Sequence, residues 1–185
     1  MKKPTKTLSS KSIYQNKFVE VKVDKVESDK NTWEQVYFVK PNKNSVGIIP
    51  MDNSGIYLVN QYRYASKEYL WQIPMGMIDK ANNELETAKI ELREEVGLTA
   101  KKFTRIGSFI AEPGMSPQAT IIFVAEGLDK VKNNPDLSKV NLQAKHFSFE
   151  QIDRKVKEGD IKCGFTLSSL IWLKSSDLFN RSRLE

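Results

Sequence analysis

The order of its periodic segments most constrains how this chain can fold. Apolar and polar residues alternate with period two over residues 18–28 and 32–39, which is typical of half-buried strands. Apolar residues recur at helical spacing over residues 83–96, and two further helices are expected at 150–158 and 166–178. The chain thus runs from strands to one helix, then to further strands and two helices. This order predicts an α+β fold with mixed sheets, not a repeated βαβ unit.

Turn-forming residues separate the remaining predicted strands. Residues 52–55, with the sequence Asp-Asn-Ser-Gly, lie between two apolar runs and predict a hairpin over residues 45–64. The next apolar run, 70–78, is interrupted by Pro74 and Gly76, which favours a loop or a short irregular strand. Further strands are expected at 103–111, 119–125 and 145–149.

Composition excludes several classes of protein. The chain has 185 residues, 39% of them hydrophobic and 28% charged, which fits a globular protein rather than a disordered one. No run approaches the roughly 18 apolar residues that span a bilayer, and the basic N-terminus has no apolar signal segment. We therefore expect a cytoplasmic protein. One histidine, His146, and one cysteine, Cys163, exclude a Cys/His zinc site, and both are expected to be structural.

The net charge is positive, with 29 basic and 23 acidic residues and a formal charge of +6. Such a balance suits an anionic ligand or a nucleic acid. The lysines are scattered and mostly alternate with acidic residues, as over residues 20–25. A solvated strand face explains this pattern better than a stripe that follows phosphates, so neither nucleic acid nor membrane is expected as a partner.

Three glutamates gather on one side of the predicted helix 83–96. Glu91, Glu94 and Glu95 are spaced i, i+3 and i+4. One interpretation is a solvated acidic face, because like charges at this spacing cost only about 0.2–0.5 kcal/mol per pair. The other is a site for Mg²⁺ or Mn²⁺, in which the oxygens of a diphosphate complete the octahedron.

The segment around this helix resembles the Nudix box, G-x5-E-x7-R-E-U-x-E-E-x-G-U, in which U is aliphatic. Gly76 aligns with the first glycine, Glu91-Leu92 with the E-U pair, and residues 94–98 with E-E-x-G-U, without a gap. Asn82 and Ile90 depart from the pattern, because they stand where the family has glutamate and arginine. Isoleucine cannot orient glutamates by charge-assisted hydrogen bonds, so we expect a less organised site that keeps its three glutamates.

Other segments resemble one Nudix branch, the ADP-ribose and nucleoside-diphosphate-sugar pyrophosphatases. Residues 61–64 and 71–76 are similar to its "QYR … WElPaG" stretch, with Gln72 in place of a common glutamate. Thr32-Trp33-Glu34 is similar to its "TWE" strand, where the tryptophan stacks on a nucleobase and the glutamate hydrogen-bonds it. The likeness covers roughly residues 18–175.

The resemblance implies a role for each matching residue. Glu91, Glu94 and Glu95 would be catalytic and bind the metal with the carbonyl of Met75; Trp33, Glu34, Arg63 and Gln118 would bind substrate. Trp33 read on its own is also compatible with a core aromatic, and Arg63 with a surface ion pair. Gln118 replaces a glutamate common in the family, and an amide cannot act as a general base. The acidic residues near loop 127–141 are Asp129 and Asp136, and neither can be placed against a substrate.

The resemblance implies the Nudix α/β/α sandwich with mixed sheets and an N-terminal antiparallel sheet. Residues 1–44 would form N-terminal strands that dimerise and complete the substrate site, and residues 45–185 the hydrolase domain. The leading hypothesis is Mg²⁺- or Mn²⁺-dependent hydrolysis of a nucleotide sugar, such as ADP-ribose or GDP-mannose, by a homodimer. The alternatives are a catalytically impaired nucleotide-sugar sensor and a hydrolase acting on RNA 5′ ends. The preferred base and sugar, the general base, the number of metals and the pathway stay open.

Overall fold

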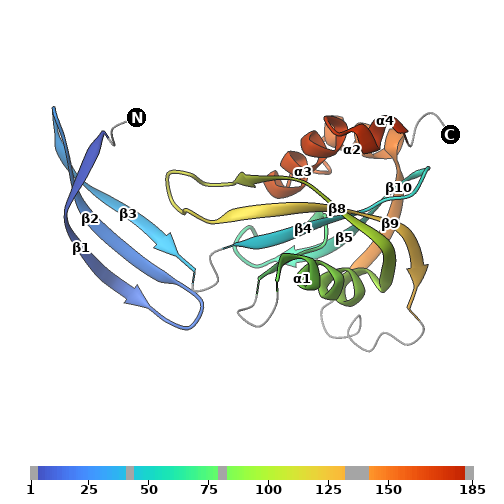
Figure 1. The fold of residues 1–185 in the computed structure, drawn as a ribbon, viewed down its shortest axis with the longest axis horizontal. Coiled ribbons are helices and arrows are strands. Elements are labelled where there is room, and N and C mark those ends of the chain that lie inside the picture. The colour runs from blue at the N-terminus through green and yellow to red at the C-terminus, as the bar shows by residue number, and fades with distance from the viewer. Residues whose placement is uncertain (1–3, 41–43, 79–82, 132–141, 182–185) are drawn as a thin grey trace. The chain divides into compact units, whose positions relative to one another are not determined.

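The computed structural model describes residues 4–40, 44–78, 83–131 and 142–181, with side chains to 179 in the last range. The chain divides into two compact units (Figure 1). The first comprises Met1–Lys43 and Ile110–Ala119, and the second comprises Asn44–Phe109 and Thr120–Glu185.

The first unit is built on an antiparallel sheet in the order β1-β2-β3. Its strands are β1 (Thr5–Gln15), β2 (Glu20–Ser28) and β3 (Thr32–Val39). The predicted strands 18–28 and 32–39 are confirmed, and they pair as expected, with Val26 opposite Trp33. Strand β1 was not predicted, because its polar sequence has no apolar alternation and all its residues are exposed.

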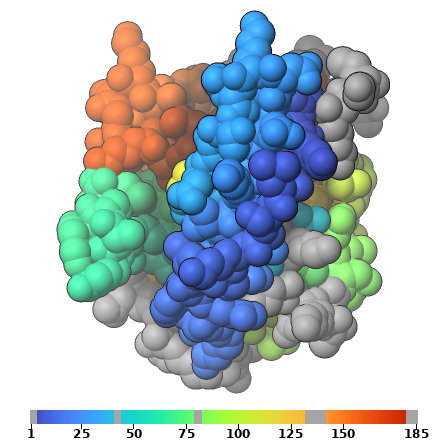
Figure 2. Space-filling model, turned by 90° about the vertical axis from the view of Figure 1, so that its left-hand side faces the viewer, coloured from blue at the N-terminus to red at the C-terminus, as the bar shows by residue number. Residues whose placement is uncertain are grey.

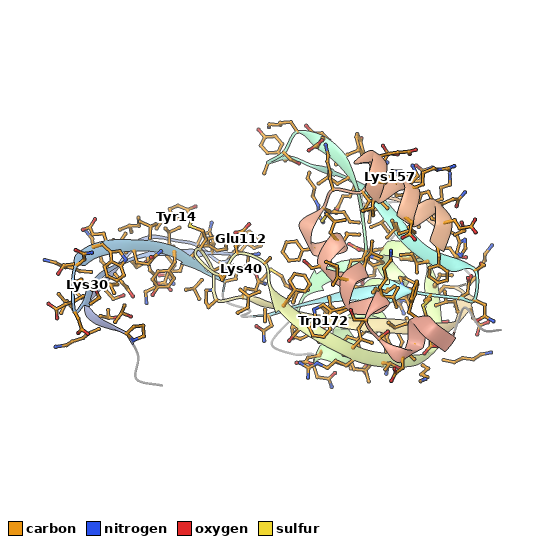
Figure 3. All side chains as sticks on the ribbon, turned by 90° about the horizontal axis from the view of Figure 1, so that it is seen from above. Tyr14, Lys30, Lys40, Glu112, Lys157 and Trp172 are labelled. Atoms are coloured by element: carbon orange, nitrogen blue, oxygen red, sulfur yellow. The ribbon has the colours of Figure 1, made fainter. Side chains whose placement is uncertain are left out.

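The loop within Ile110–Ala119 is fastened to β3 of the same unit. The backbone N–H of Phe38 donates to the carbonyl of Met115 over 2.9 Å, and Nε2 of Gln35 donates to the carbonyl of Gly114 over 3.1 Å. Among the described residues of this unit, only Val26 and Ser116 are buried. The sheet therefore has very little core of its own. Tyr14, labelled in Figure 3, is 55% exposed.

The second unit contains two sheets. The mixed sheet has the order β7-β4-β9-β8, in which β4 pairs parallel with β9 and antiparallel with β7. The antiparallel sheet has the order β10-β5-β6. The strands are β4 (Ser45–Pro50), β5 (Gly55–Arg63), β6 (Glu68–Gln72), β7 (Met75–Met77), β8 (Leu98–Ile110), β9 (Ala119–Lys130) and β10 (Gln143–Ser148).

Helices cover these strands on two sides. Figure 1 shows α1 on one side and α2, α3 and α4 on the other. The bounds are α1 (Glu84–Glu91), a π-helical turn η1 (Leu92–Val96), α2 (Phe149–Glu158), α3 (Gly164–Lys174) and α4 (Asp177–Arg181). The predicted α+β class and α/β/α sandwich are therefore confirmed. No helix in the described part of the chain is both long enough and apolar enough to span a bilayer.

Alternating side chains of β4 supply both cores of the sandwich. Val46 and Ile48 pack in one cluster with Leu92, and Ile49 packs in the other with residues of α2 and α3. All three β4 side chains are completely buried. On the α3 side, Trp172 lies over Gly107 of β8, where an added methyl group would be 2.5 Å from the indole ring (Figure 3).

The predicted hairpin over residues 45–64 is wrong. The turn forms, and Oδ1 of Asp52 accepts hydrogen bonds from the backbone N–H groups of Ser54 and Gly55. It closes only a single bridge, between Met51 and Ile56, after which β4 and β5 enter different sheets. The reason is that β4 is covered on both faces and pairs with β9, so that β5 pairs with β10 and β6 instead.

Of two other segments, the first is irregular as expected and the second differs from expectation. The apolar run 70–78 forms the end of β6 and the short strand β7, separated by Ile73 and Pro74. The predicted helix 166–178 is divided into α3 and α4, with Ser175 as the C-cap of α3 and Ser176 at the break. Both the backbone N–H and the hydroxyl of Ser176 donate to the carbonyl of Leu173, over 3.0 and 2.7 Å.

Replacing Gly55 by alanine is expected to destabilise the second unit. The added methyl group would lie 2.0 Å from the carbonyl oxygen of Phe147, a backbone atom of the paired strand β10 that cannot rotate away. Overpacking of this kind costs about 1–3 kcal/mol. Urea unfolding measures the loss, with Gly164→Ala as a control because nothing lies within 4 Å of its added methyl group. Equal stability of the two variants would contradict the prediction.

Candidate active site

Gly76 in β7 and Glu91 at the end of α1 are in direct contact. A methyl group added to Gly76 would lie 1.8 Å from Oε1 of Glu91 and 2.7 Å from its Cγ. Gly76 is held in place because β7 pairs with β4, with Gly76 opposite Val46. The glycine is therefore needed for space, since the Glu91 side chain packs where any larger residue would project.

Glu95 is fixed to the same strand by a hydrogen bond. The backbone N–H of Met75 donates to Oε2 of Glu95 over 3.0 Å. Two neighbouring residues of β7 thus contact two glutamates four positions apart in the chain. Met75 was expected to act through its carbonyl, and that role stays a prediction, whereas its N–H orients Glu95.

The helix that carries the glutamates is not regular throughout. It begins at the N-cap Asn83, whose side chain accepts a hydrogen bond from the N–H of Glu86 over 2.9 Å. The last turn, η1, is π-helical, and it ends at Gly97 with φ of 73° in the left-handed region that glycine favours. π-Helical turns are rare and are frequent at functional sites. Apolar spacing predicts the helix and its end, but not the wide turn that carries Glu94 and Glu95.

Burial and like charge raise the pKa of two glutamates. Burial is the main cause for Glu91, and the charge of Glu94 adds to it, which raises the pKa to about 7. For Glu95, burial and then the charge of Glu91 raise the pKa to about 7, against the Met75 hydrogen bond and the positive charge of Arg63. The site therefore holds two carboxyl groups that resist simultaneous ionisation.

This donor set fits a hard divalent cation. Within the described ranges, no three His, Cys, Asp or Glu side chains converge closely enough to hold a cation by themselves. Mg²⁺ is usually held by one or two carboxylates together with substrate phosphates, and a pair such as Glu91 and Glu95 can supply those carboxylates. A cation would compensate the carboxylate charges whose burial and mutual repulsion raise the pKa of both groups. Glu94 is half-buried, and its place as a third ligand stays a prediction.

Divalent cations are expected to stabilise the protein more at pH 8 than at pH 5. Glu91 and Glu95 bind protons up to about pH 7 when folded but only to about pH 4.5 when unfolded, so their contribution to stability falls as pH rises through this window. Cations compete with these protons. At 100 times Kd the gain is about 2.7 kcal/mol, or roughly 5–10 °C in Tm. Thermal scans with Mg²⁺ or EDTA measure it, and an equal shift at both pH values would oppose the prediction.

Arg63 lies at the end of β5 and is held by an amide. Its Nε donates to Oε1 of Gln72 over 2.7 Å, and Nε2 of Gln72 in turn contacts Sγ of Cys163 at 3.1 Å. Gln72 and Cys163 are buried, and Arg63 is half-buried. Arg63 is near enough to the glutamates for its charge to lower the pKa of Glu95. The structure thus brings together Met75, Gly76, Glu91, Glu95 and Arg63.

The other predicted substrate residues belong to the first unit. Trp33 of β3 is 39% exposed, so it is not a core aromatic, and Glu34 is exposed opposite Lys25. Gln118 is half-buried, and its backbone N–H donates to Oγ of Ser116 over 3.3 Å. The substrate-binding roles of Trp33, Glu34 and Gln118 stay predictions.

Four further residues were singled out from the sequence. Ile90 is 38% exposed on α1, away from the apolar contacts of the helix. Asp129 is exposed on β9, where its carboxylate lies 3.9 Å from Nζ of Lys101. Asn82 and Asp136 lie outside the described residues.

The two residues expected to be structural behave as such. His146 of β10 lies 3.2 Å from Asp52 in the turn before β5, and its ring contacts the edge of Tyr57. Cys163 is buried, as predicted, but its contact with Gln72 could not be foreseen, because 91 positions separate the two residues.

Comparison with known proteins shows the family of this chain. The family model described as NUDIX domain matches residues 41–163, which include both glutamates, Gly76 and Arg63. The chain belongs to the NUDIX family. The matched range contains the whole segment from Gly76 to Leu98 that resembles the Nudix box.

Individual relatives share most of this Nudix chain. The ADP-ribose pyrophosphatase of Bacillus subtilis (strain 168) is 30% identical over 72% of each chain. A methanol dehydrogenase activator of Bacillus methanolicus is 29% identical over the same shares. The crystal structure of an ADP compounds hydrolase aligns with a TM-score of 0.82 and 21% identity, covering 98% of this chain and 97% of the other, which shows a shared fold.

Proposed function

We propose that this Nudix protein hydrolyses the diphosphate of ADP-ribose or a similar nucleotide sugar to a nucleoside monophosphate and a sugar phosphate. Its family and its similarity to an ADP-ribose pyrophosphatase make it a hydrolase that acts on pyrophosphate bonds. The observation that carries the proposal is the pair of half-buried carboxyl groups, Glu91 and Glu95, packed against β7.

The chemistry follows from charge. A diphosphate repels a nucleophilic water, and Arg63 offers a planar guanidinium whose N–H groups match phosphate oxygens. Mg²⁺ or Mn²⁺ held by Glu91 and Glu95, with Glu94 and the carbonyl of Met75, would supply charge neutralisation and lower the pKa of an attacking water. A carboxylate of the site is proposed to accept the proton of this water.

We assign binding of the nucleobase to residues of the first unit. The exposed indole of Trp33 suits stacking on a base, which is worth about 1–3 kcal/mol in nucleic-acid binders. The neighbouring Glu34 carboxylate can accept a hydrogen bond from an exocyclic amine, and the Gln118 amide can bond a phosphate or a water. These assignments rest on the resemblance and on the exposure of Trp33 and Glu34.

The first unit is also proposed to form a homodimer with a second copy. A three-stranded sheet needs a covered hydrophobic face to be stable, and this sheet buries only Val26 among its own described residues. Figure 2 shows the strands of the first unit, coloured blue, in space-filling form. Besides Trp33, the unit exposes several large apolar side chains that a partner copy would cover: Leu8, Ile13, Tyr14, Phe18 and Val36.

A substrate panel tests the proposed reaction. ADP-ribose, GDP-mannose, UDP-sugars and ADP-sugars are incubated with Mg²⁺, Mn²⁺ or EDTA, and the products are separated by chromatography. We expect metal-dependent release of AMP and ribose 5-phosphate from ADP-ribose. Tight binding of a panel member without turnover in either metal would overturn the proposal.

Light scattering tests the homodimer. We expect twice the chain mass for the wild type, and a shift toward monomer for a variant with charges on the exposed apolar residues of the first unit, such as Phe18→Glu with Val36→Lys. The matched control is Tyr64→Glu in the second unit, because Tyr64 is 78% exposed. A wild-type mass equal to one chain at micromolar concentration would contradict the assembly.

A further inference from the structure

A buried amide links Arg63 to the start of α3. Oε1 of Gln72 accepts from Nε of Arg63 over 2.7 Å, and Nε2 of Gln72 contacts Sγ of Cys163 at 3.1 Å. Gln72 is only 4% exposed and Cys163 only 7%. The three side chains come from β5, β6 and the N-cap of α3. They therefore link two strands from the first half of the second unit's sequence to a helix near its C-terminal end.

The orientation of this amide is dictated by its partners. Arginine has donors and no acceptor, so the oxygen of Gln72 must face Arg63. The NH₂ group then points the other way and needs an acceptor, because a buried donor without a partner costs free energy. The sulfur of Cys163 is the acceptor at that position, and it thereby fixes which way the amide is turned.

The backbone around Gln72 is held by the same helix. The N–H of Ile73 donates to Oγ1 of Thr166 over 3.1 Å, and Thr166 is completely buried in the first turns of α3. Two consecutive residues of the chain, Gln72 and Ile73, are therefore bonded to side chains of one rigid element. This places the amide oxygen at a defined point next to the guanidinium.

The neutrality of Gln72 distinguishes this contact from an ion pair. A carboxylate in the same place would form a charge-assisted hydrogen bond and neutralise the positive charge of the guanidinium. An amide orients the guanidinium without neutralising its charge. Gln72 therefore leaves the positive charge of Arg63 to act on Glu95 and on an anion in the site.

We propose that Gln72, held by Cys163, is a positioning residue that orients Arg63 toward the substrate's diphosphate without itself neutralising the charge of the guanidinium. The inference rests on the proposed hydrolysis of a nucleoside-diphosphate sugar, and it adds a determinant of substrate affinity. Gln72 acts through Arg63 and is not itself a catalytic residue. Its effect should fall on KM and on substrate affinity rather than on kcat.

Substitutions at Gln72 separate orientation from charge. Gln72→Met keeps the length of the side chain but removes both contacts, and we expect KM for ADP-ribose to rise about 10- to 100-fold. Gln72→Glu keeps the acceptor but compensates the charge, and we expect KM to rise about tenfold. For both variants kcat should change less than about threefold. Gln151→Met on the exposed N-terminal turn of α2 is the matched control and should leave KM unchanged.

Substitutions at Cys163 test whether it holds the amide. Cys163→Ala removes the acceptor of Nε2, and KM should rise in the same direction as for Gln72→Met but by less. Cys163→Ser restores an acceptor, and KM should return toward the wild-type value. A wild-type KM in Cys163→Ala would overturn the role of Cys163.

Two readouts keep this inference separate from the proposed reaction. The first is the NMR resonance of the Arg63 Nε–H, which is assigned by its loss in Arg63→Lys. In Gln72→Met this resonance should shift, and the proton should exchange faster with solvent. The second is calorimetry with ADP-ribose in EDTA, which should show weaker binding to Gln72→Met. An unchanged resonance or unchanged affinity overturns the positioning role even if the wild type hydrolyses ADP-ribose. If the wild type binds ADP-ribose without hydrolysing it, only the reaction fails. A wild type that does not bind ADP-ribose overturns both.

Discussion

Replacing Glu95 by glutamine is expected to lower kcat by about 10²–10⁴-fold while the protein stays folded. Glutamine has the same shape and keeps an oxygen that can accept the hydrogen bond from the N–H of Met75. It cannot accept a proton at neutral pH, and it offers a cation a neutral oxygen in place of a charged one. The substitution therefore removes the proton acceptor and the negative charge of Glu95 but preserves the shape and packing of the side chain.

The same substitution should stabilise the metal-free protein at pH 8. The pKa of Glu95 is raised to about 7, so at pH 8 the folded protein holds an unfavourable charge that the unfolded chain does not resist. Glutamine removes this charge and the repulsion by Glu91. At pH 4, where Glu95 is protonated in the folded state, the stability gain should disappear. Stability gained together with activity lost is typical of a residue kept for function.

Steady-state kinetics with ADP-ribose and unfolding in EDTA at both pH values measure these effects. Glu86→Gln is the matched control, because Glu86 lies on the same helix, is exposed and pairs with Lys89. We expect wild-type kcat for the control. Near wild-type turnover in Glu95→Gln would refute the assigned role of Glu95.

Replacing Gly76 by alanine is expected to reduce activity about 100-fold, since a displacement of about 1 Å at a reacting centre has this effect. The added methyl group would lie 1.8 Å from Oε1 and 2.2 Å from Cδ of Glu91, so the whole carboxyl group must move. The backbone itself can accept alanine, because the left-handed glycines among the described residues are Gly97, Gly127 and Gly159. The defect should therefore lie in the site rather than in the fold.

A double-mutant cycle checks this cause. If Gly76 acts only by leaving room for Glu91, then Gly76→Ala should have little effect in a protein that already carries Glu91→Ala. Gly164→Ala provides the control for an added methyl group, because its surroundings are open. Additive losses in the cycle would show that Gly76 has a role independent of Glu91.

The local pattern of apolar and polar residues predicted the structure correctly wherever contacts between neighbouring residues determine it. Period-two alternation predicted β2 and β3, and apolar spacing with Gly97 predicted the helix that carries Glu91 and Glu95. The resemblance to the Nudix box then assigned the family from a motif with fixed spacing, and the family match confirmed it. The roles of the individual site residues remain predictions for the variants above to test.

The same pattern predicted the structure poorly where contacts between residues distant in sequence determine it. Strand β1 is polar and exposed, and it is a strand because it pairs with β2. Strand β4 resembles half of a hairpin, but its neighbour is β9, about 75 positions away, where Ser45 lies opposite Thr120. The π-helical turn η1 is likewise invisible to a helical-period count.

The sequence by itself determined the family, the acidic helix and the residue types that can hold a cation, because these depend on spacing along one element. Only the tertiary structure decided that Gly76 makes room for Glu91, that Met75 orients Glu95, and that Cys163 holds the amide facing Arg63. Each of these contacts joins residues 15 to 91 positions apart. Burial, which raises the pKa of the two glutamates, likewise exists only once the layers of the sandwich have closed around them.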